Sequence, residues 1–271
     1  MRLLRSSNWL ADPRCRVADR LGVLLGQRDT LTPPAALFDD ADRMDGSRDV
    51  RDFVMVGENT VGWLISEGLQ PTDRVLEIGC GIGRMAIPLM RHLERGGSYA
   101  GLEVDRDKVR YCIQTVGSVA PNFEFRHADV FNKYYNPGGK TRGEDYTFPY
   151  DDDSVDFAFL VSVFTHMLPE GMQRYLSEVS RVMAPGATCI SSFWLTRQTL
   201  GPPYHRYSDV SEIYDLEEPE HGVVYVEEYV RGCFDQCGLQ LGRVWRGSRF
   251  GQSDPSHNRN SQQDIVIATK P

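Results

Sequence analysis

The chain has 271 residues, of which 41% are hydrophobic and 25% charged, and its net charge is −8 from 30 Lys and Arg against 38 Asp and Glu. This composition is typical of a globular protein with one large domain or two small ones, and it excludes a disordered or fibrous chain. The apolar runs are far shorter than the roughly 18 residues that cross a bilayer, and residues 1–9 lack the apolar core of a signal peptide. We therefore predict a cytoplasmic protein with no membrane partner.

The charge and the cysteines exclude further classes of partner. An acidic balance without a basic run argues against nucleic acid, because phosphate backbones are bound mainly by clustered Lys and Arg. The six cysteines form no CxxC pair and no Cys/His cluster at zinc spacing. Asp151, Asp152 and Asp153 are oxygen ligands of the kind that hard cations prefer. Consecutive residues of an extended chain do not converge on one ion, however, so we predict no metal site.

The predicted elements begin with a helix whose apolar face runs from Phe53 to Ile65 and which ends near Gly68. Residues 1–50 have weaker periodicity and are predicted to form an N-terminal helical cover, which leaves residues 51–271 as the main domain. From residue 73 onward, short apolar runs alternate with helix-period segments, as in βαβ units around a parallel sheet. The predicted strands are residues 74–78, 98–104, 123–125, 155–161, 188–194, 239–245 and 264–269, and the predicted helices lie at about 85–94, from Pro169 to before Pro185, and at about 226–237.

Two long connections interrupt this alternation, residues 127–150 and residues 196–225. Both are rich in Gly, Pro and Tyr. Loops of this length in a compact domain are usually functional or mobile. We predict that they form acceptor-side loops or a lid. The last two strands are joined by a polar loop and predict an antiparallel edge.

The sharpest signal is the hydrophobic strand that runs into Gly79, Gly81 and Gly83. Without Cβ atoms such a loop turns tightly and lets a ligand approach its backbone amides. A dinucleotide site normally reads GxGxxG, because a pyrophosphate has to be accommodated there. Here the spacing is GxGxG, with Glu77 two residues ahead. The pattern favours a ligand without phosphates.

The second predicted strand ends in two acids, Glu103 and Asp105, about two dozen residues beyond the first glycine. A nucleotide-type fold keeps at this distance the acid that binds ribose hydroxyls. We predict that Glu103 takes this role and that Asp105 caps the helix beginning at Arg106. The alternative is that either acid is only a solvated residue at the strand end.

Together with residues 125–130, 148–156 and 181–186, these features resemble the class I S-adenosylmethionine-dependent methyltransferases. The resemblance covers about residues 70–195 well. It implies an α/β, Rossmann-like fold with a seven-stranded, mostly parallel sheet of order 3-2-1-4-5-7-6 and helices on both faces. It also implies S-adenosylmethionine as the cofactor.

The resemblance implies a role for each cofactor position. The glycines would wrap the methionine part, and Glu77 would help to orient its amino group. Glu103 would hold the ribose, Asp129 would accept from the adenine amine, and Val130 would pack against the adenine ring, in the mostly apolar slot typical of ligand pockets. The residues so assigned are Glu77, Gly79, Gly81, Gly83, Glu103, Asp129 and Val130.

The acceptor is expected over the carboxyl ends of the fourth and fifth strands, where open α/β sheets bind ligands. His166 lies there and is the candidate general base, since an unperturbed imidazole titrates near neutral pH. Methyl transfer needs the acceptor aligned and, for a hydroxyl, deprotonated. Alternatively, His166 caps the helix that follows or closes the cofactor pocket.

The long loop after the third strand offers substrate-binding residues. Tyr134, Tyr135 and Asn136 are predicted to pack on and hydrogen-bond a ring-shaped acceptor, and His205 is a weaker substrate candidate in the later insertion. The N-x-x-YNP-x-G loop, the FTHMLP segment and the QD-I-V-I-A strand resemble stand-alone bacterial methyltransferases that modify small molecules or saccharides. The alternative is a structural loop with tyrosines packed on the sheet edge.

The sequence thus predicts an S-adenosylmethionine-dependent methyltransferase that O-methylates a small molecule, such as a sugar or a secondary metabolite, with no nucleic-acid partner. An N- or C-methyltransferase on a small molecule, and a non-catalytic cofactor-binding scaffold, are the alternatives. The identity of the acceptor and the oligomeric state, including a homodimer, stay open.

Overall fold

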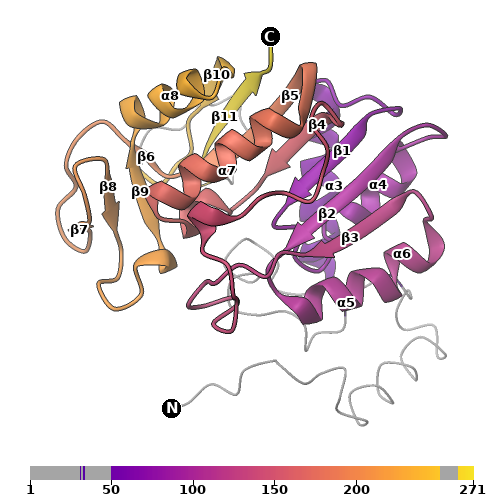
Figure 1. Ribbon diagram of the computed structural model, residues 1–271, viewed down its shortest axis with the longest axis horizontal. Helices are drawn as coiled ribbons and strands as arrows, with labels where there is room; N and C mark the ends of the chain where they lie inside the picture. Colours follow the sequence, from indigo (N-terminus) through magenta and orange to yellow (C-terminus); the bar gives the residue numbers. More distant parts are fainter. Residues whose placement is uncertain (1–30, 32, 34–49, 251–261) are drawn as a thin grey trace. The chain divides into compact units, whose positions relative to one another are not determined.

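The computed structural model describes residues 31, 33, 50–250 and 262–271 (Figure 1). The predicted N-terminal cover, residues 1–50, lies almost wholly outside them and stays a prediction. The chain divides into two compact units, one formed by residues 1–72 with 80–127 and the other by residues 73–79 with 128–271. None of the helices in the described part of the chain has the length and apolarity needed to cross a bilayer.

The main sheet has seven strands in the order β10-β11-β5-β4-β1-β2-β3, which confirms the predicted strand order. Strand β11 runs antiparallel to β10, as predicted, and also antiparallel to β5, whereas β4 runs parallel to β1 and to β5. The strands are β1 (Arg74–Ile78), β2 (Ser98–Glu103), β3 (Phe123–His127), β4 (Val155–Leu160), β5 (Met183–Phe193), β10 (Gln240–Trp245) and β11 (Asp264–Thr269).

Within its described residues, the first unit holds β2, β3 and four α-helices. Helix α5 begins where predicted, because the Asp105 carboxylate accepts from the amides of Asp107 and Lys108 and so caps it. On the sheet, the rings of Tyr99 and Phe123 stack with centroids 4.9 Å apart. The helices of this unit are α3 (Val50–Ser66), α4 (Ala86–His92), α5 (Arg106–Gln114) and α6 (Val116–Val119).

In its described part, the second unit holds the remaining strands of the main sheet and two α-helices, α7 (Pro169–Val182) and α8 (Glu227–Gln236). Strand β4 is almost entirely buried, as its run of apolar residues predicts. Helix α7 has Pro169 in its first turn, where the missing amide costs no intrahelical bond. Its buried face includes Met172, Leu176 and Val179. In Figure 1, α7 and α8 lie over one face of these strands.

The segment predicted to form acceptor-side loops or a lid, residues 196–225, contributes strands to a second sheet of order β6-β9-β8-β7, which the sequence analysis did not predict. This sheet has a buried centre, since Val223, Val224 and Tyr225 are fully buried. Burial of this apolar run stabilises the pairing of the strands. The surrounding Gly and Pro residues are typical of loops, so the sequence did not predict these strands. Its strands are β6 (Leu195–Thr196), β7 (His205–Arg206), β8 (Ser211–Ile213) and β9 (Val223–Val226).

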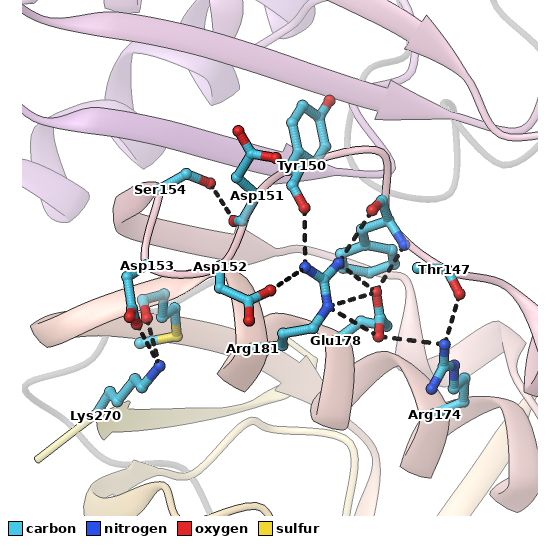
Figure 2. Close-up of polar contacts among 12 residues, drawn as sticks. Thr147, Tyr150, Asp151, Asp152, Asp153, Ser154, Arg174, Glu178, Arg181 and Lys270 are labelled. Carbon is cyan, nitrogen blue, oxygen red and sulfur yellow. Dashed lines mark hydrogen bonds and ion pairs between the residues drawn. The ribbon is translucent and has the colours of Figure 1, made fainter.

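The acidic run before β4 is held by cations (Figure 2). The Arg181 guanidinium lies between Asp152 and Glu178, at 2.7 Å from each carboxylate, and also donates to the carbonyls of Phe148 and Tyr150. Lys270 Nζ lies 2.7 Å from Asp153 Oδ1. The described residues contain no group of three or more His, Cys, Asp or Glu side chains that could hold a metal ion. Asp152 and Asp153 are therefore held in ion pairs, which is a structural role.

Candidate cofactor and acceptor sites

In the first unit, the glycine turn meets the end of β2 through Glu103. Its Oε2 accepts from the Gly81 amide at 2.8 Å and its Oε1 from the Asp105 amide at 2.9 Å. Gly81 and Gly83 have φ of +53° and +81°, a region that residues with a Cβ rarely adopt. The turn therefore presents the Gly81 amide to a carboxylate that is only 7% exposed.

Burial raises the pKa of Glu103, while Lys108 and the two amide hydrogen bonds act to lower it. An ionised carboxylate offers about four acceptor positions, so two amide bonds leave capacity for two further donors. Ribose hydroxyls are donors of this kind, and they would also compensate for the desolvation of the carboxylate. The residues present thus fit the nucleoside that the sequence predicts here.

In the second unit, Gly79 and the segment after β4 are in close contact. Gly79 has φ of +77°, and a Cβ there would lie 2.6 Å from Val163 Cγ2. Ser162 also has a positive φ, +60°. It is held there because its amide donates to Ser192 Oγ and its own Oγ accepts from Gln263 Nε2, both at 2.7 Å. Such strained backbone is commonly retained at functional sites.

The remaining predicted cofactor residues of this unit lie where their strands end. Glu77 is fully buried in β1, Val130 is 4% exposed and Asp129 is half-buried. The Asp129 carbonyl accepts from the amides of Lys140 and Thr141, which fixes the chain where β3 leads into the long loop.

The loop that carries Tyr134, Tyr135 and Asn136 is held by its own side chains. Asn132 Oδ1 accepts from the amides of Tyr134 and Tyr135, at 3.0 and 2.8 Å. Asn136 Nδ2 donates to the Val130 carbonyl at 2.9 Å, so this amide has a local structural partner in addition to any role toward an acceptor. The two tyrosine rings meet edge to face at 4.9 Å.

His166 lies in the short helix η3 (Phe164–His166), two residues before Leu168, which is the N-cap of α7. It therefore does not cap that helix. Its Nδ1 lies 3.0 Å from the Glu220 carbonyl, which can only accept, so Nδ1 carries the proton and Nε2 of the neutral ring carries the lone pair. The Tyr135 ring packs edge-on against the imidazole at 5.6 Å. This tautomer is the one that a general base acting through Nε2 requires.

Several residues that sequence reasoning missed surround His166, and they come from helix η4 (Pro219–His221) and its neighbours. Burial raises the pKa of Glu220, the Lys133 amide that donates to it acts to lower the pKa, and nearby Glu144 raises it further. Lys133 Nζ also donates to the Glu217 carbonyl at 2.5 Å, which ties the long loop to η4. Only the density of aromatic and acidic residues around 204–221 signals this region in the sequence.

His205, the weaker substrate candidate, lies in β7, the exposed edge strand of the second sheet. Its neighbour Tyr204 is the better-anchored side chain, since its hydroxyl accepts from Arg249 Nε at 3.0 Å. The Arg249 guanidinium in turn lies 3.7 Å from the centroid of the Trp194 ring.

Comparisons with known proteins bear on this site. Residues 75–186 match a family model described as a methyltransferase domain. The mouse tRNA N(3)-cytidine methyltransferase METTL2 is 24% identical over 123 residues, which cover 45% of this chain and 29% of that protein. Ribosomal RNA small subunit methyltransferase A of Picosynechococcus is 43% identical over 68 residues, 25% of this chain and 23% of that one. The chain thus spans less than a third of these relatives' length.

Among solved structures, a SAM-dependent methyltransferase from Aquifex aeolicus superposes with a TM-score of 0.55 at 20% identity, over 86% of this chain and all of that one. This likeness shows that the fold is shared. It does not bear on the acceptor.

The curated relatives overturn the predicted partner, a small-molecule acceptor with no nucleic acid, because they are named for tRNA and ribosomal RNA. The prediction rested on the net charge of −8, which is a sum over the chain. Such a sum does not reveal whether Lys and Arg gather locally. Nor does it bear on an enzyme that contacts bases rather than phosphates.

The match over residues 75–186 begins in β1, includes the glycine turn and Glu103, and continues past His166 to the start of β5. Residues 75–186 are thus similar to a methyltransferase domain, and the seven-stranded sheet in the predicted order agrees with the fold of the class I S-adenosylmethionine-dependent methyltransferases.

Proposed function

We propose that the protein methylates RNA, with S-adenosylmethionine as the donor and a nucleotide as the acceptor. The observation that carries the cofactor half is the buried Glu103 carboxylate on the Gly81 amide. The acceptor class is supported by the curated relatives, two of whose names specify tRNA and ribosomal RNA.

The chain's own residues divide the work of binding the donor. Glu103 accepts from the ribose hydroxyls, and the glycine turn leaves room for the methionine part beside its backbone. Asp129 accepts from the adenine amine, with the buried Val130 against the ring. When bound, S-adenosylmethionine supplies a methyl group made electrophilic by the sulfonium. Glu77 helps to orient the amino group of the methionine part.

At the acceptor, His166 has the central role. Its Nδ1–H is directed to the Glu220 carbonyl, so Nε2 is the atom that accepts a proton from a ribose hydroxyl or a protonated base nitrogen. Tyr135 limits the rotation of the imidazole by packing edge-on against it. Positioning supplies much of the acceleration in a transfer of this kind.

Methyl-labelled S-adenosylmethionine incubated with total tRNA, and separately with ribosomal RNA, tests this proposal. We expect label in RNA that ribonuclease renders acid-soluble, and a methylated nucleoside in the mass spectrum of the digest. That spectrum also distinguishes a base nitrogen or carbon from a ribose oxygen. His166→Ala should lower the rate by roughly 100-fold or more while retaining cofactor affinity. Absence of label from both RNA pools, with the cofactor shown to bind by calorimetry, would contradict the proposal.

A further inference from the structure

A chain of aromatic rings extends from His166 across the second unit. Consecutive members contact one another, with ring centroids 4.9 Å apart for the first pair and 5.9 to 6.2 Å apart for the rest. The chain starts at Tyr135, whose ring packs on His166. We call this set the aromatic belt; its members are Tyr135, Tyr134, His221, Tyr214, Tyr204 and Phe250.

The belt combines exposure with rigid support. Tyr134 is 42% exposed and Tyr214 is 44% exposed, so part of each ring is open to a ligand. The backbone beneath them is fixed, because Asn132 holds the Tyr134 amide and the Tyr214 amide donates to the Gly222 carbonyl at 2.9 Å. A Cβ on Gly222 would lie 2.8 Å from the Trp194 ring, so the corner next to His221 is closely packed. Rings held in place in this way bind a planar ligand at a low cost in conformational entropy.

Charged groups of both signs lie beside the belt. Glu220 directly precedes His221, whereas Lys133 directly precedes Tyr134 and Arg249 Nε donates to the Tyr204 hydroxyl at 3.0 Å. The belt itself is made of rings, which contact bases rather than phosphates. Successive bases of single-stranded RNA commonly stack on aromatic side chains, whereas bases inside a duplex are inaccessible to such stacking.

We propose that the aromatic belt is a stacking platform for unpaired bases of single-stranded RNA, next to the nucleotide that lies at His166. This inference rests on the proposed function and extends it, because it specifies the secondary structure of the substrate and the residues that select it. The belt is continuous with His166, the candidate general base, through the contact of its ring with Tyr135.

The test is the affinity of the full chain for a fluorescein-labelled, 15-nucleotide RNA without secondary structure, measured by anisotropy, with a duplex of equal length for comparison. We expect tighter binding of the single strand. Tyr134→Leu and Tyr214→Leu should each weaken it by about 5-fold to 100-fold, the range of base–aromatic stacking. The ratio between variant and wild type should stay constant between low and moderate salt, since stacking is not screened whereas phosphate contacts are.

Matched variants separate the ring from other effects. Tyr214→Phe keeps the ring and should restore most of the affinity lost in Tyr214→Leu. Leu216→Ala removes an apolar side chain that is 64% exposed in the same segment and should have no effect. Unchanged melting temperature and cofactor affinity would show that the leucine variants are folded.

Three results would overturn the inference: no binding of the single strand, equal affinity of the leucine variants and the wild type, or preference for the duplex. Failure of the proposed function is distinct, because it is a lack of methyl transfer and leaves oligonucleotide affinity as a separate observable.

Discussion

Glu103 and Glu220 are both acids whose pKa is raised chiefly by burial, but the regions around them are built in different ways. Glu103 is held by amides 2 and 22 residues away in a turn that depends on glycine. Glu220 receives its hydrogen bond from Lys133, 87 residues away, and the rings of Tyr134 and Tyr214, from two long connections, contact its neighbour His221. The arrangement around Glu103 suits a cofactor, which is the same molecule whatever the acceptor is. The arrangement around Glu220 is assembled from segments that can vary without disturbing the sheet, as suits an acceptor site.

The largest effect is expected from Gly79→Ala. The new Cβ would lie 2.6 Å from Val163 Cγ2 in a backbone conformation with φ of +77°. Relief of this strain and overlap, about 3 kcal/mol together, requires the turn to shift, and we expect the displaced turn to bind the cofactor roughly 100-fold more weakly, measured by calorimetry. Gly62→Ala, in α3 with no atom within 4 Å of the new Cβ, is the control and should leave affinity unchanged. If Gly79→Ala bound the cofactor as tightly as the wild type, the assignment of Gly79 to the cofactor site would be wrong.

Glu103→Ala should weaken S-adenosylmethionine binding by roughly 1.5 to 3 kcal/mol, because hydrogen bonds to a charged group are lost. The matched variant is Glu124→Ala, on the neighbouring strand, whose side chain is 48% exposed and pairs with Arg126. It should bind the cofactor as the wild type does. If calorimetry gave the two variants the same affinity, the assignment of Glu103 to the ribose would be wrong.

The free energy of unfolding at acid pH should depend on a third carboxylate, Glu227, which belongs to neither region. Burial acts to raise the pKa of Glu227, but hydrogen bonds from Arg197, Arg246 and Arg231 lower it to about 2. A depressed folded-state pKa contributes stability above the unfolded value of about 4.3, and this is lost as pH falls toward 2. Urea unfolding of Glu227→Gln should therefore show a shallower loss between those values than the wild type. Parallel curves would contradict this.

A smaller effect is expected from Arg181→Leu, which removes the cation shown at the centre of Figure 2. Glu178 would then lose one of its cationic partners while 4% exposed, at a cost of about 2 kcal/mol in unfolding free energy. Arg126→Leu breaks an exposed pair on β3 and should cost less than about 1 kcal/mol. Similar urea midpoints for the two variants would show that the ion pairs of Arg181 are no stronger than a surface ion pair.

The sequence predicted the bounds of some strands better than those of others. The bounds of β1 and β11 agree with the prediction because each is a short apolar run with clear ends. Strand β5 begins at Met183, earlier than predicted, since Met183 pairs with Val155 across a bulge despite the Pro185-Gly186 that follows. Only tertiary pairing favours that extension.

The candidate site divides in the same way. The contact between Gly81 and Glu103 follows from the length of one βαβ unit, so local reasoning reaches it. The contacts of His166 with Glu220, and of Lys133 with Glu217, join segments 54 and 84 residues apart. No periodicity encodes such pairs. The second sheet was missed for a related reason, because its strands are only two to four residues long.

The most direct test of the account is a steady-state assay of labelled methyl transfer in which S-adenosylmethionine and RNA are varied independently. Wild type, Glu103→Ala and Tyr134→Leu would be compared. The account predicts that Glu103→Ala raises the KM for S-adenosylmethionine with little change in that for RNA, and that Tyr134→Leu does the reverse. If both variants raised the same KM, or if neither raised any, the division of the molecule into a fixed cofactor region and an aromatic acceptor region would be contradicted.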